Sequence, residues 1–424
     1  MIVATRLWRK VVIGLSLLGI QYSSVMPMCW DNRYFPLFEH MYTGADSRES
    51  NLDTTFFVIK GGDAFRFQSR ANKEELAITF PELWGELDLV QVANSMVKAG
   101  EPNPLPDDWL WLSEIKAFMP ASIEGQGGII SGFVPFLSHF GIGGSIMVQQ
   151  LNNFVSVVPG NEAISKLNLN TPGNQAVFMQ TMQRIYQTIG INSTASQSVG
   201  VGDIVLYASL HDTHEYKYKF HKLDWGVLGG IIIPNGLKQD FSNLASLPFG
   251  GMFGGWAWFL VPRAEFELRD DLIFGFQARI IQRFDHCAIS RIPFGNENML
   301  FAPKVGQVYI DQGTTYSVAP YFVFQNIRAG LGVQLQYTIT GHEHDYFSSN
   351  CIANGNKPQF CEMNYYSAWT QEYFTFKLFY DIGYDKNWKN KPSAYFIWDI
   401  PMNHVAGKGF ARTNRVSIGC NINF

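Results

Sequence analysis

The chain ends in the segment Arg415-Val416-Ser417-Ile418-Gly419-Cys420-Asn421-Ile422-Asn423-Phe424, and this segment decides the fold class. From Val416 onward every second residue is apolar, and the residues between them are polar or glycine. Successive side chains of a strand point to opposite faces, so the segment has one apolar and one polar face. In a bilayer such an apolar face meets lipid, and the polar face lines the inside of a barrel. The segment therefore predicts a membrane-spanning barrel strand.

The composition favours strands over helices as the membrane-spanning elements. Charged residues make up 16% of the chain and aromatic residues 15%, whereas ordinary soluble domains are roughly 25% charged. Mean hydropathy is only -0.03, although each membrane helix needs about 20 consecutive apolar residues. The net charge of -4, with no basic run, excludes nucleic acid as an expected partner.

The same period-two pattern recurs upstream of the last segment. It predicts an all-β fold, a transmembrane antiparallel up-and-down β-barrel of about twelve strands, with fourteen as the alternative and with one or two helical inserts. The expected strands are 54–60, 128–136, 141–151, 204–210, 216–233, 257–268, 273–283, 318–324, 333–340, 374–384, 394–400 and 416–424.

Short and long connections alternate between these strands. Short turns are expected near 212–213, 269–271, 325–327 and 385–391, and long loops near 235–250, 286–313, 340–370 and 403–410. Outer-membrane barrels have short periplasmic turns and longer external loops. A soluble β-sandwich, the alternative fold, has no reason to keep this alternation. With the last strand ending at the periplasm, every long loop then lies outside the cell, which predicts location in a bacterial outer membrane.

The N-terminus has the pattern of an export signal. Arg6, Arg9 and Lys10 precede the apolar run 11–20, which has the length of a signal-peptide core and is short for a membrane anchor, the alternative. We therefore expect a signal peptide at 1–25, an N-terminal periplasmic segment at 26–53 and an outer-membrane barrel at 54–424.

Two inserts interrupt the strand pattern. Residues 62–125 are expected to form a helical insert or plug, with a helix from Pro81 to Gly100, because proline suits a helix start and glycine a helix end. Residues 152–199 are expected to be an external loop with a helix from Thr171 to Gly190. The helices either pack against the barrel and their own loops or serve as a plug or lid.

The charged residues of the inward faces are the candidate functional set. They can pair across strands and brace the wall, or, in a wet lumen, set the field that selects solutes; both interpretations stay open. The expected lumen-lining charges are Arg263, Glu265, Glu267, Arg279, Arg283, Lys377 and Asp381.

The cysteines give one further expectation. Cys351 and Cys361 flank a short polar segment, and export permits disulfides. We predict that they form a disulfide that staples one loop, with two free thiols as the alternative. Cys420 is expected to face lipid unpaired.

No catalytic signature is present in the sequence. It contains no nucleophile elbow, zinc-protease helix or phosphate loop, so no enzyme activity, cofactor or metal is expected. His342 and His344 could converge on a metal, but a solvated loop base is the favoured interpretation.

Two stretches resemble outer-membrane channels for hydrophobic compounds, the long-chain fatty-acid and aromatic-hydrocarbon transporters. Gly200-Val201-Gly202-Asp203-Ile204-Val205-Leu206 is similar to their strand-opening Gly-Asp segment, and 225–236 is similar to the strand after it, with its Pro-x-Gly exit. The family's Asn-Pro-Ala signature is not found, and Asn103-Pro104-Leu105 is the nearest stretch. The resemblance implies a barrel embedded in a lipid bilayer, with Phe424 as the terminal signal that the barrel-assembly machinery recognises.

The function expected from these observations is passive diffusion or uptake of small solutes, hydrophobic ones among them. The alternative is a surface-display or adhesion barrel, in which the long external loop 340–370 contacts a partner. A barrel hydrolase is the weakest hypothesis, because no serine–histidine pair is evident at either rim.

Overall fold

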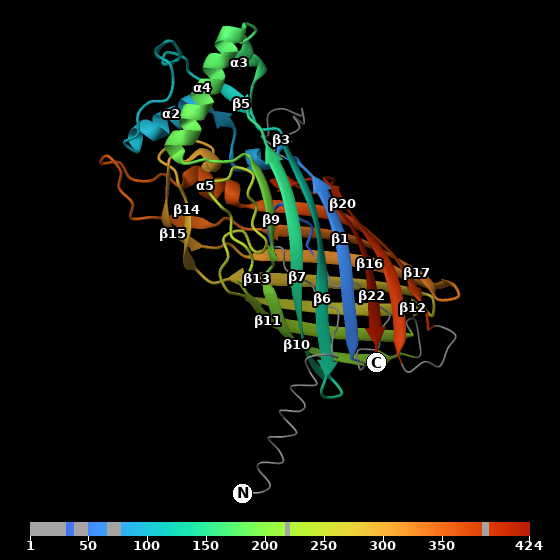
Figure 1. The fold of residues 1–424 in the computed structure, drawn as a ribbon. Coiled ribbons are helices and arrows are strands. Elements are labelled where there is room, and N and C mark those ends of the chain that lie inside the picture. Colours follow the sequence, from blue (N-terminus) through green and yellow to red (C-terminus); the bar gives the residue numbers. More distant parts are fainter. Residues whose placement is uncertain (1–30, 38–49, 66–77, 217–220, 384–389) are drawn as a thin grey trace, which may run out of the picture.

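The computed structural model describes residues 31–37, 50–65, 78–216, 221–383 and 390–424. Twelve antiparallel strands close into a barrel (Figure 1). The predicted signal peptide at 1–25 lies outside the described residues. In order around the barrel, the strands are β10 (Ile204–Glu215), β11 (Lys222–Ile233), β12 (Ala257–Arg269), β13 (Leu272–Arg283), β16 (Thr315–Arg328), β17 (Leu331–His342), β19 (Trp369–Asp381), β20 (Lys391–Met402), β22 (Asn414–Asn423), β1 (Asn51–Gly61), β6 (Ala121–Pro135) and β7 (Phe140–Val155).

The last strand joins the two ends of the described chain. β22 pairs with β20 on one edge and with β1 on the other, where Asn51 is opposite Asn423. The ring closes where β7 pairs with β10. The prediction of twelve strands is confirmed, and each predicted strand overlaps one strand of the barrel.

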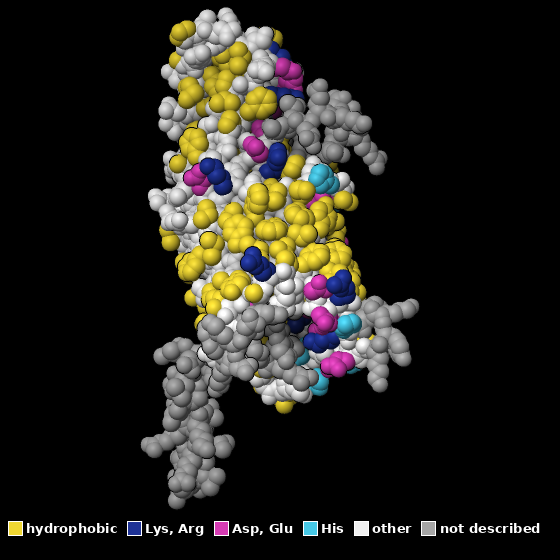
Figure 2. All heavy atoms as spheres, turned by 90° about the vertical axis from the view of Figure 1, so that its right-hand side faces the viewer, with side chains coloured by type: hydrophobic (Ala, Val, Ile, Leu, Met, Phe, Trp, Pro, Cys, Tyr) yellow, Lys and Arg dark blue, Asp and Glu magenta, His cyan; other side chains and the backbone are white. Residues whose placement is uncertain are grey.

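The predicted side-chain alternation is confirmed on β22. Val416, Ile418 and Cys420 are exposed, whereas Ser417 and Asn421 are buried. The neighbouring strands follow the same rule, and Figure 2 shows hydrophobic side chains gathered in a band across the middle of this face, with charged residues mostly above and below it. Such a band is the lipid-facing belt of an outer-membrane barrel, and this architecture places the protein in the outer membrane.

Glycines let aromatic side chains lie flat inside the barrel. A Cβ atom added at any of several inward-facing glycines would fall on an aromatic ring of the neighbouring strand. The cross-strand partners are Gly143 with Tyr207, Gly230 with Phe259, Gly275 with Tyr321, Gly332 with Phe379 and Gly419 with Tyr395. These pairs account for part of the high glycine content.

One strand outside the closed barrel prolongs its wall. β9 (Ala195–Val201) pairs with the outer part of β7, and β10 pairs with the remainder of the same edge. Val148 is opposite Val201 and Ser145 is opposite Val205, so the register slips by one residue at Gly202 and Asp203. β9 and β10 are therefore one long strand with a break at these two residues.

The connections agree with the predicted alternation. Short turns join the strands at one end, and long connections join them at the other. Two turns lie three or more residues later than predicted: β10 continues to Glu215, and β16 reaches Arg328 before Ala329 and Gly330 turn the chain with φ values of 43° and 88°.

The long connections fold together into a cap over one mouth of the barrel. We define the cap as residues 62–65, 78–120, 156–194, 234–256, 284–314, 343–368 and 403–413. Its strands form three small sheets, and α3 and α4 lie at the end of the cap farthest from the barrel (Figure 1). The sheets are β14 (His286–Ile292), β15 (Lys304–Asp311) and β18 (Tyr346–Ser348); β4 (Leu87–Asp88), β5 (Lys116–Phe118) and β8 (Val158–Pro159); and β21 (Phe410–Ala411), β2 (Asp63–Phe65) and β3 (Ile78–Thr79). The helices are η1 (Phe80–Trp84), α2 (Leu89–Lys98), η2 (Asp107–Trp109), α3 (Asn161–Lys166), α4 (Pro172–Ile189), η3 (Met299–Phe301) and α5 (Cys361–Ser367). Buried side chains from all these elements except β8 join those of the upper barrel wall, such as Phe57 and Leu151, in one hydrophobic cluster.

One of the two predicted helices is confirmed, and the other is wrong in part. The helix at 171–190 is confirmed as α4, with Thr171 before it and Gly190 ending it at φ 73°. The single helix from Pro81 to Gly100 is wrong in its first half, because Gly85 at φ 109° separates η1 from α2. The helices η1, α2 and α4 all belong to the cap. Among the described residues, none of the helices is long and apolar enough to cross a membrane.

The predicted disulfide is not formed. Cys351 and Cys361 are free thiols, as are the other described cysteines, Cys287 and Cys420. Cys351 packs against the cap's hydrophobic cluster, whereas Cys361 begins α5 with its side chain exposed. One cysteine therefore lies against the protein interior and the other faces solvent.

The predicted periplasmic segment at 26–53 is also corrected in part. Its described residues Asp31 to Leu37 are buried, and they contact the cap and the inner wall of the barrel. The prediction failed because the polar residues of this segment find partners inside the protein rather than water.

Candidate functional site

A short N-terminal segment crosses the inside of the barrel below the cap. We call residues 31–37 the strap. At its first residue, Arg283 of β13 donates two hydrogen bonds to the Asp31 carboxylate, from Nε at 2.7 Å and from Nη2 at 2.5 Å. At its other end, Arg415 of β22 donates to the carbonyl of Pro36 at 3.0 Å and to that of Leu37 at 3.3 Å. β13 and β22 are five strands apart in the ring of twelve, so the strap joins nearly opposite walls.

The first anchor includes the break between β9 and β10. Asp203 lies at that break and is 2% exposed. Its Oδ2 atom lies 3.3 Å from Nη2 of Arg283 and accepts from the backbone of Gly251, while Oδ1 accepts from Gly236, both at 3.0 Å. One guanidinium therefore joins the strap, the strand break and a cap loop.

The second anchor is a buried pair on two adjacent strands. Asp399 of β20 accepts from Nε of Arg415 at 2.7 Å and from the Thr375 hydroxyl at 2.7 Å. These contacts orient the guanidinium so that its two remaining nitrogens reach the strap carbonyls. Removing one partner from such a buried pair costs about 3–5 kcal/mol.

The middle of the strap is bonded to the cap. Arg33 donates to the carbonyls of Leu83 at 3.0 Å and Ser367 at 2.8 Å, and its guanidinium lies 4.5 Å from the centre of the Trp84 ring. The indole nitrogen of Trp84 donates to the Tyr34 hydroxyl at 3.0 Å. Burial lowers the pKa of Arg33 to about 10, so it keeps its charge at neutral pH. The strap and the cap are thus one hydrogen-bonded unit.

A wall of neutral polar side chains lies beside the strap. On β17, Gln334 donates to Gln336 at 3.2 Å, and Gln336 donates to Thr338 at 3.1 Å. Among the described residues, Oε1 of Gln334, the Thr340 hydroxyl and both amide atoms of Gln371 have no hydrogen-bond partner, although all three residues are buried.

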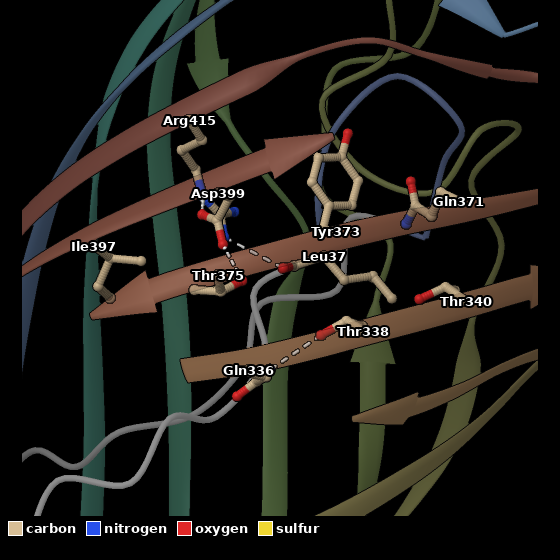
Figure 3. Close-up of a pocket in the computed structure, with 10 residues that line it drawn as sticks. All are labelled: Leu37, Gln336, Thr338, Thr340, Gln371, Tyr373, Thr375, Ile397, Asp399 and Arg415. Atoms are coloured by element: carbon tan, nitrogen blue, oxygen red, sulfur yellow. Dashed lines mark hydrogen bonds and ion pairs between the residues drawn. The ribbon is translucent and has the colours of Figure 1, made fainter. Parts of the chain in front are cut away.

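A small cavity separates this wall from the strap. It has a volume of about 20 Å³ and is bordered by Leu37 and by side chains of β17, β19, β20 and β22. Figure 3 shows Gln371 and Thr340 at one side of it and the Arg415–Asp399 pair at the other. This volume holds about one water molecule, so little free space remains between Leu37 and the polar wall.

Solved structures of outer-membrane channels resemble this chain, although no family model and no curated protein matches it. An outer membrane channel from Pseudomonas putida F1 aligns over 90% of this chain and 97% of its own length, with 9% identity and a TM-score of 0.47. A Pseudomonas aeruginosa FadL homologue aligns over 89% of this chain and 90% of its own, with 11% identity and a TM-score of 0.31. The Ralstonia pickettii toluene transporter TbuX aligns over 88% of each chain, with 9% identity and a TM-score of 0.31.

The structure divides the predicted lumen charges into separate groups. Arg283 is the strap anchor near the cap, whereas Glu265, Arg279 and Lys377 are buried farther down the lumen. Glu265 accepts from the Tyr321 hydroxyl at 2.5 Å, and the Lys377 ammonium lies 4.9 Å from the centre of the Tyr395 ring. Glu265 and Lys377 therefore contact different aromatic side chains.

The other predicted charges lie nearer the short turns. Arg263 is half-buried on β12, and Asp381 accepts from the backbone of Gly383 at 2.9 Å, which makes it a turn residue. Glu267, His221 and Asp270 bring their ligand atoms within 4.8 Å of one another, a grouping that could hold a metal ion. His221 and Asp270 are exposed and already paired at 2.9 Å, and no sequence pattern pointed to this grouping.

The predicted metal candidates His342 and His344 are held apart. His342 lies 3.0 Å from the Asp345 carboxylate and 2.7 Å from the Thr315 hydroxyl, whereas Nδ1 of His344 contacts the backbone of Asn364 at 2.9 Å. Both imidazoles serve as loop-base residues.

Sequence reasoning missed the strap and its anchors. Asp203 was quoted only as part of a motif, and Asp31 was assigned to a periplasmic segment. Asp399 and Arg415 carried a usable signal, because both lie on inward faces of adjacent predicted strands. Their register places Arg415 directly opposite Asp399, but nothing in the sequence shows that the strap carbonyls complete the site.

Proposed function

We propose that this protein is an outer-membrane channel for the passive passage of small solutes and that the strap holds it closed. The observation that carries the proposal is the pair of buried anchors, Asp31–Arg283 and Arg415 with the strap carbonyls, on nearly opposite walls. A barrel that only filled the membrane could close its lumen with side chains from its own strands. A separate segment that side-chain anchors join to the walls is instead a removable obstruction.

The cap supports the same proposal. It gathers all the long connections over one mouth, and Arg33 bonds the strap to two of them. A solute entering from outside meets the cap first and the strap next. The buried lumen charges Glu265, Arg279 and Lys377 then bias which solutes continue toward the short turns.

The exposed surface of the cap favours a second candidate function, the binding of a partner outside the cell. Trp111, Met179, Ile352 and Val405 are 77%, 61%, 64% and 71% exposed, and large apolar side chains at loop tips are suited to protein contacts. In that case, shortening the loop 343–368 abolishes partner binding and leaves ion conductance unchanged.

Planar-bilayer conductance of the full-length protein tests the channel. We expect a low, intermittent current from the wild-type protein and a clearly larger mean current from the double variant Asp31→Asn with Arg415→Met, which weakens both anchors. The shift in gel mobility on heating, which folded outer-membrane barrels show, controls for folding. A folded double variant that conducts no better than an empty bilayer contradicts the proposal.

A further inference from the structure

We infer that the β17–β19 wall is a binding subsite for an uncharged polar solute that presents hydroxyl or amide groups. The inference rests on the proposed channel function and names its substrate class. In the closed state, the space for this solute is taken by the side chain of Leu37.

The first observation is a set of unpaired polar atoms on adjacent positions. Thr340 and Gln371 are direct partners in the register of β17 and β19. Thr340 is 0% exposed and Gln371 1%, and no described residue bonds their three free polar atoms. Buried amides and hydroxyls nearly always have a partner. The missing partner here belongs to something that enters the lumen.

The chemistry of these atoms defines the partner. Gln371 offers both a donor and an acceptor, and Thr340 can act as either. None of them carries a charge. The charged groups that line the cavity, Asp399 and Arg415, neutralise each other at 2.7 Å. The wall therefore gives an ion no compensating charge, whereas a polyol or an amide satisfies both donors and acceptors.

An apolar solute fits this wall poorly. It would leave the same amides and hydroxyls unpaired, and sites built to hydrogen-bond a substrate reject analogues that lack the group. The apolar side chain of Leu37 is itself a poor match for the polar wall. Its side chain borders the cavity opposite the polar wall, while only its backbone carbonyl is bonded, to Arg415 at 3.3 Å. If a polar solute displaced the Leu37 side chain, the unpaired amide and hydroxyl atoms of the wall would gain hydrogen-bond partners.

Block of the ion current by added solutes tests the inference on the full-length protein in planar bilayers. The variant Leu37→Ala opens the cavity and serves as the background. The probes are arabinose, which is uncharged and rich in hydroxyls, gluconate, which is charged, and toluene, which is apolar. We expect arabinose to block the current at lower concentration than gluconate, and toluene at its solubility limit to leave the current unchanged.

Substitutions of the wall identify the subsite. In the Leu37→Ala background, Thr340→Val and Gln371→Leu should each raise the half-blocking arabinose concentration about fivefold, the loss of roughly one hydrogen bond. Gln126→Leu, the same change at an exposed position on β6, should leave it unchanged. Thr340→Val keeps the side-chain volume, and heat-modified gel mobility checks the folding of each variant.

Two results overturn the inference and leave the channel intact: a current that toluene blocks more strongly than arabinose does, or an arabinose block that neither wall substitution changes. A folded wild-type protein and Leu37→Ala variant that both carry no current overturn the proposed function, and the subsite with it.

Discussion

Asp31 and Arg283 lie 252 positions apart in the sequence and form a two-pronged ion pair inside the protein. Their side chains are only 2% and 4% exposed. Asp203 lies 3.3 Å from the same guanidinium, so two carboxylates share one cation. A movement of the strap therefore changes the environment of the β9–β10 break, and a movement of the cap loop changes the hold on the strap.

Substituting Asp31→Asn should loosen the strap without unfolding the barrel. Arg283 keeps Asp203 and the carbonyl of Gly255 at 2.7 Å, so we expect a local loss near the lower end of the about 3–5 kcal/mol for breaking a buried pair. A loss of about 3 kcal/mol corresponds to roughly a hundredfold faster hydrogen exchange at the strap amides.

The matched control for Asp31→Asn is Glu124→Gln, which breaks the exposed pair between Lys60 and Glu124. Exposed pairs contribute about 0–1 kcal/mol, so exchange in the strap should not change in this variant. Equal protection of the strap in wild type and Asp31→Asn would show that the ion pair does not hold it.

The sequence was sufficient for the barrel but not for its contents. The alternation in β22 and the order of short and long connections depend on local patterns that solvent and lipid impose on each strand separately. They placed twelve strands and assigned inward residues such as Lys377 and Arg283 to the lumen. The strap depends on contacts between Asp31 and a strand end more than 250 residues away, and no local periodicity reports such a contact.

The cap shows a second limit of sequence reasoning. α4 was predictable because its apolar stripe repeats at helical spacing over a long segment. η1 and α2 were merged, because the positive φ of Gly85 is a consequence of tertiary packing. The Cys351–Cys361 pairing failed for a similar reason: sequence spacing says nothing about which side chain packs into the cluster and which faces solvent.

Glu372 should anchor the loop between β20 and β22. Its carboxylate accepts from the backbone of His404, Val405 and Ala406 and from the Tyr337 hydroxyl at 2.6 Å. Glu372→Gln removes the charge that strengthens these bonds, and hydrogen bonds to charged groups contribute about 1.5–3 kcal/mol. We expect hydrogen exchange at residues 404–406 to accelerate at least tenfold. Tyr337→Phe removes one bond only and should have a smaller effect; an equal effect of both variants would argue against the carboxylate as anchor.

The stability of the cap should fall as pH rises, because of Glu297. Burial raises the pKa of this carboxyl from 4.5, although the Ser95 hydroxyl donates to it at 2.5 Å and the backbone of Phe294 at 3.0 Å. Above pH 4.5 the unfolded chain loses the proton first while the folded cap retains it, so the folded state binds more protons and stability decreases with rising pH.

The measurement for Glu297 is hydrogen exchange in α2 between pH 4 and pH 8, corrected for the intrinsic exchange rate. Protection should be highest at the acid end and fall as pH rises through the raised pKa. Glu297→Gln keeps the acceptor without the titration, so its profile should be flat over this window. Protection that increases with pH in the wild-type protein would mean that the carboxyl is stabilised in its ionised form.

Gly419→Ala should destabilise the barrel through one aromatic ring. A Cβ atom at residue 419 would fall on the ring of Tyr395, whose hydroxyl is fixed by Asp53 at 2.7 Å and by Thr55 at 2.5 Å. The ring cannot move without breaking these bonds, so we expect a loss of about 1–3 kcal/mol, typical of overpacking. Urea unfolding in detergent micelles measures this loss of stability.

Gly128→Ala is the control, because its added Cβ would lie an ordinary 3.5 Å from Phe56. In a Tyr395→Ala background the cost of Gly419→Ala should nearly vanish, and a cost that persists there would place the strain in the backbone of β22 instead of the ring.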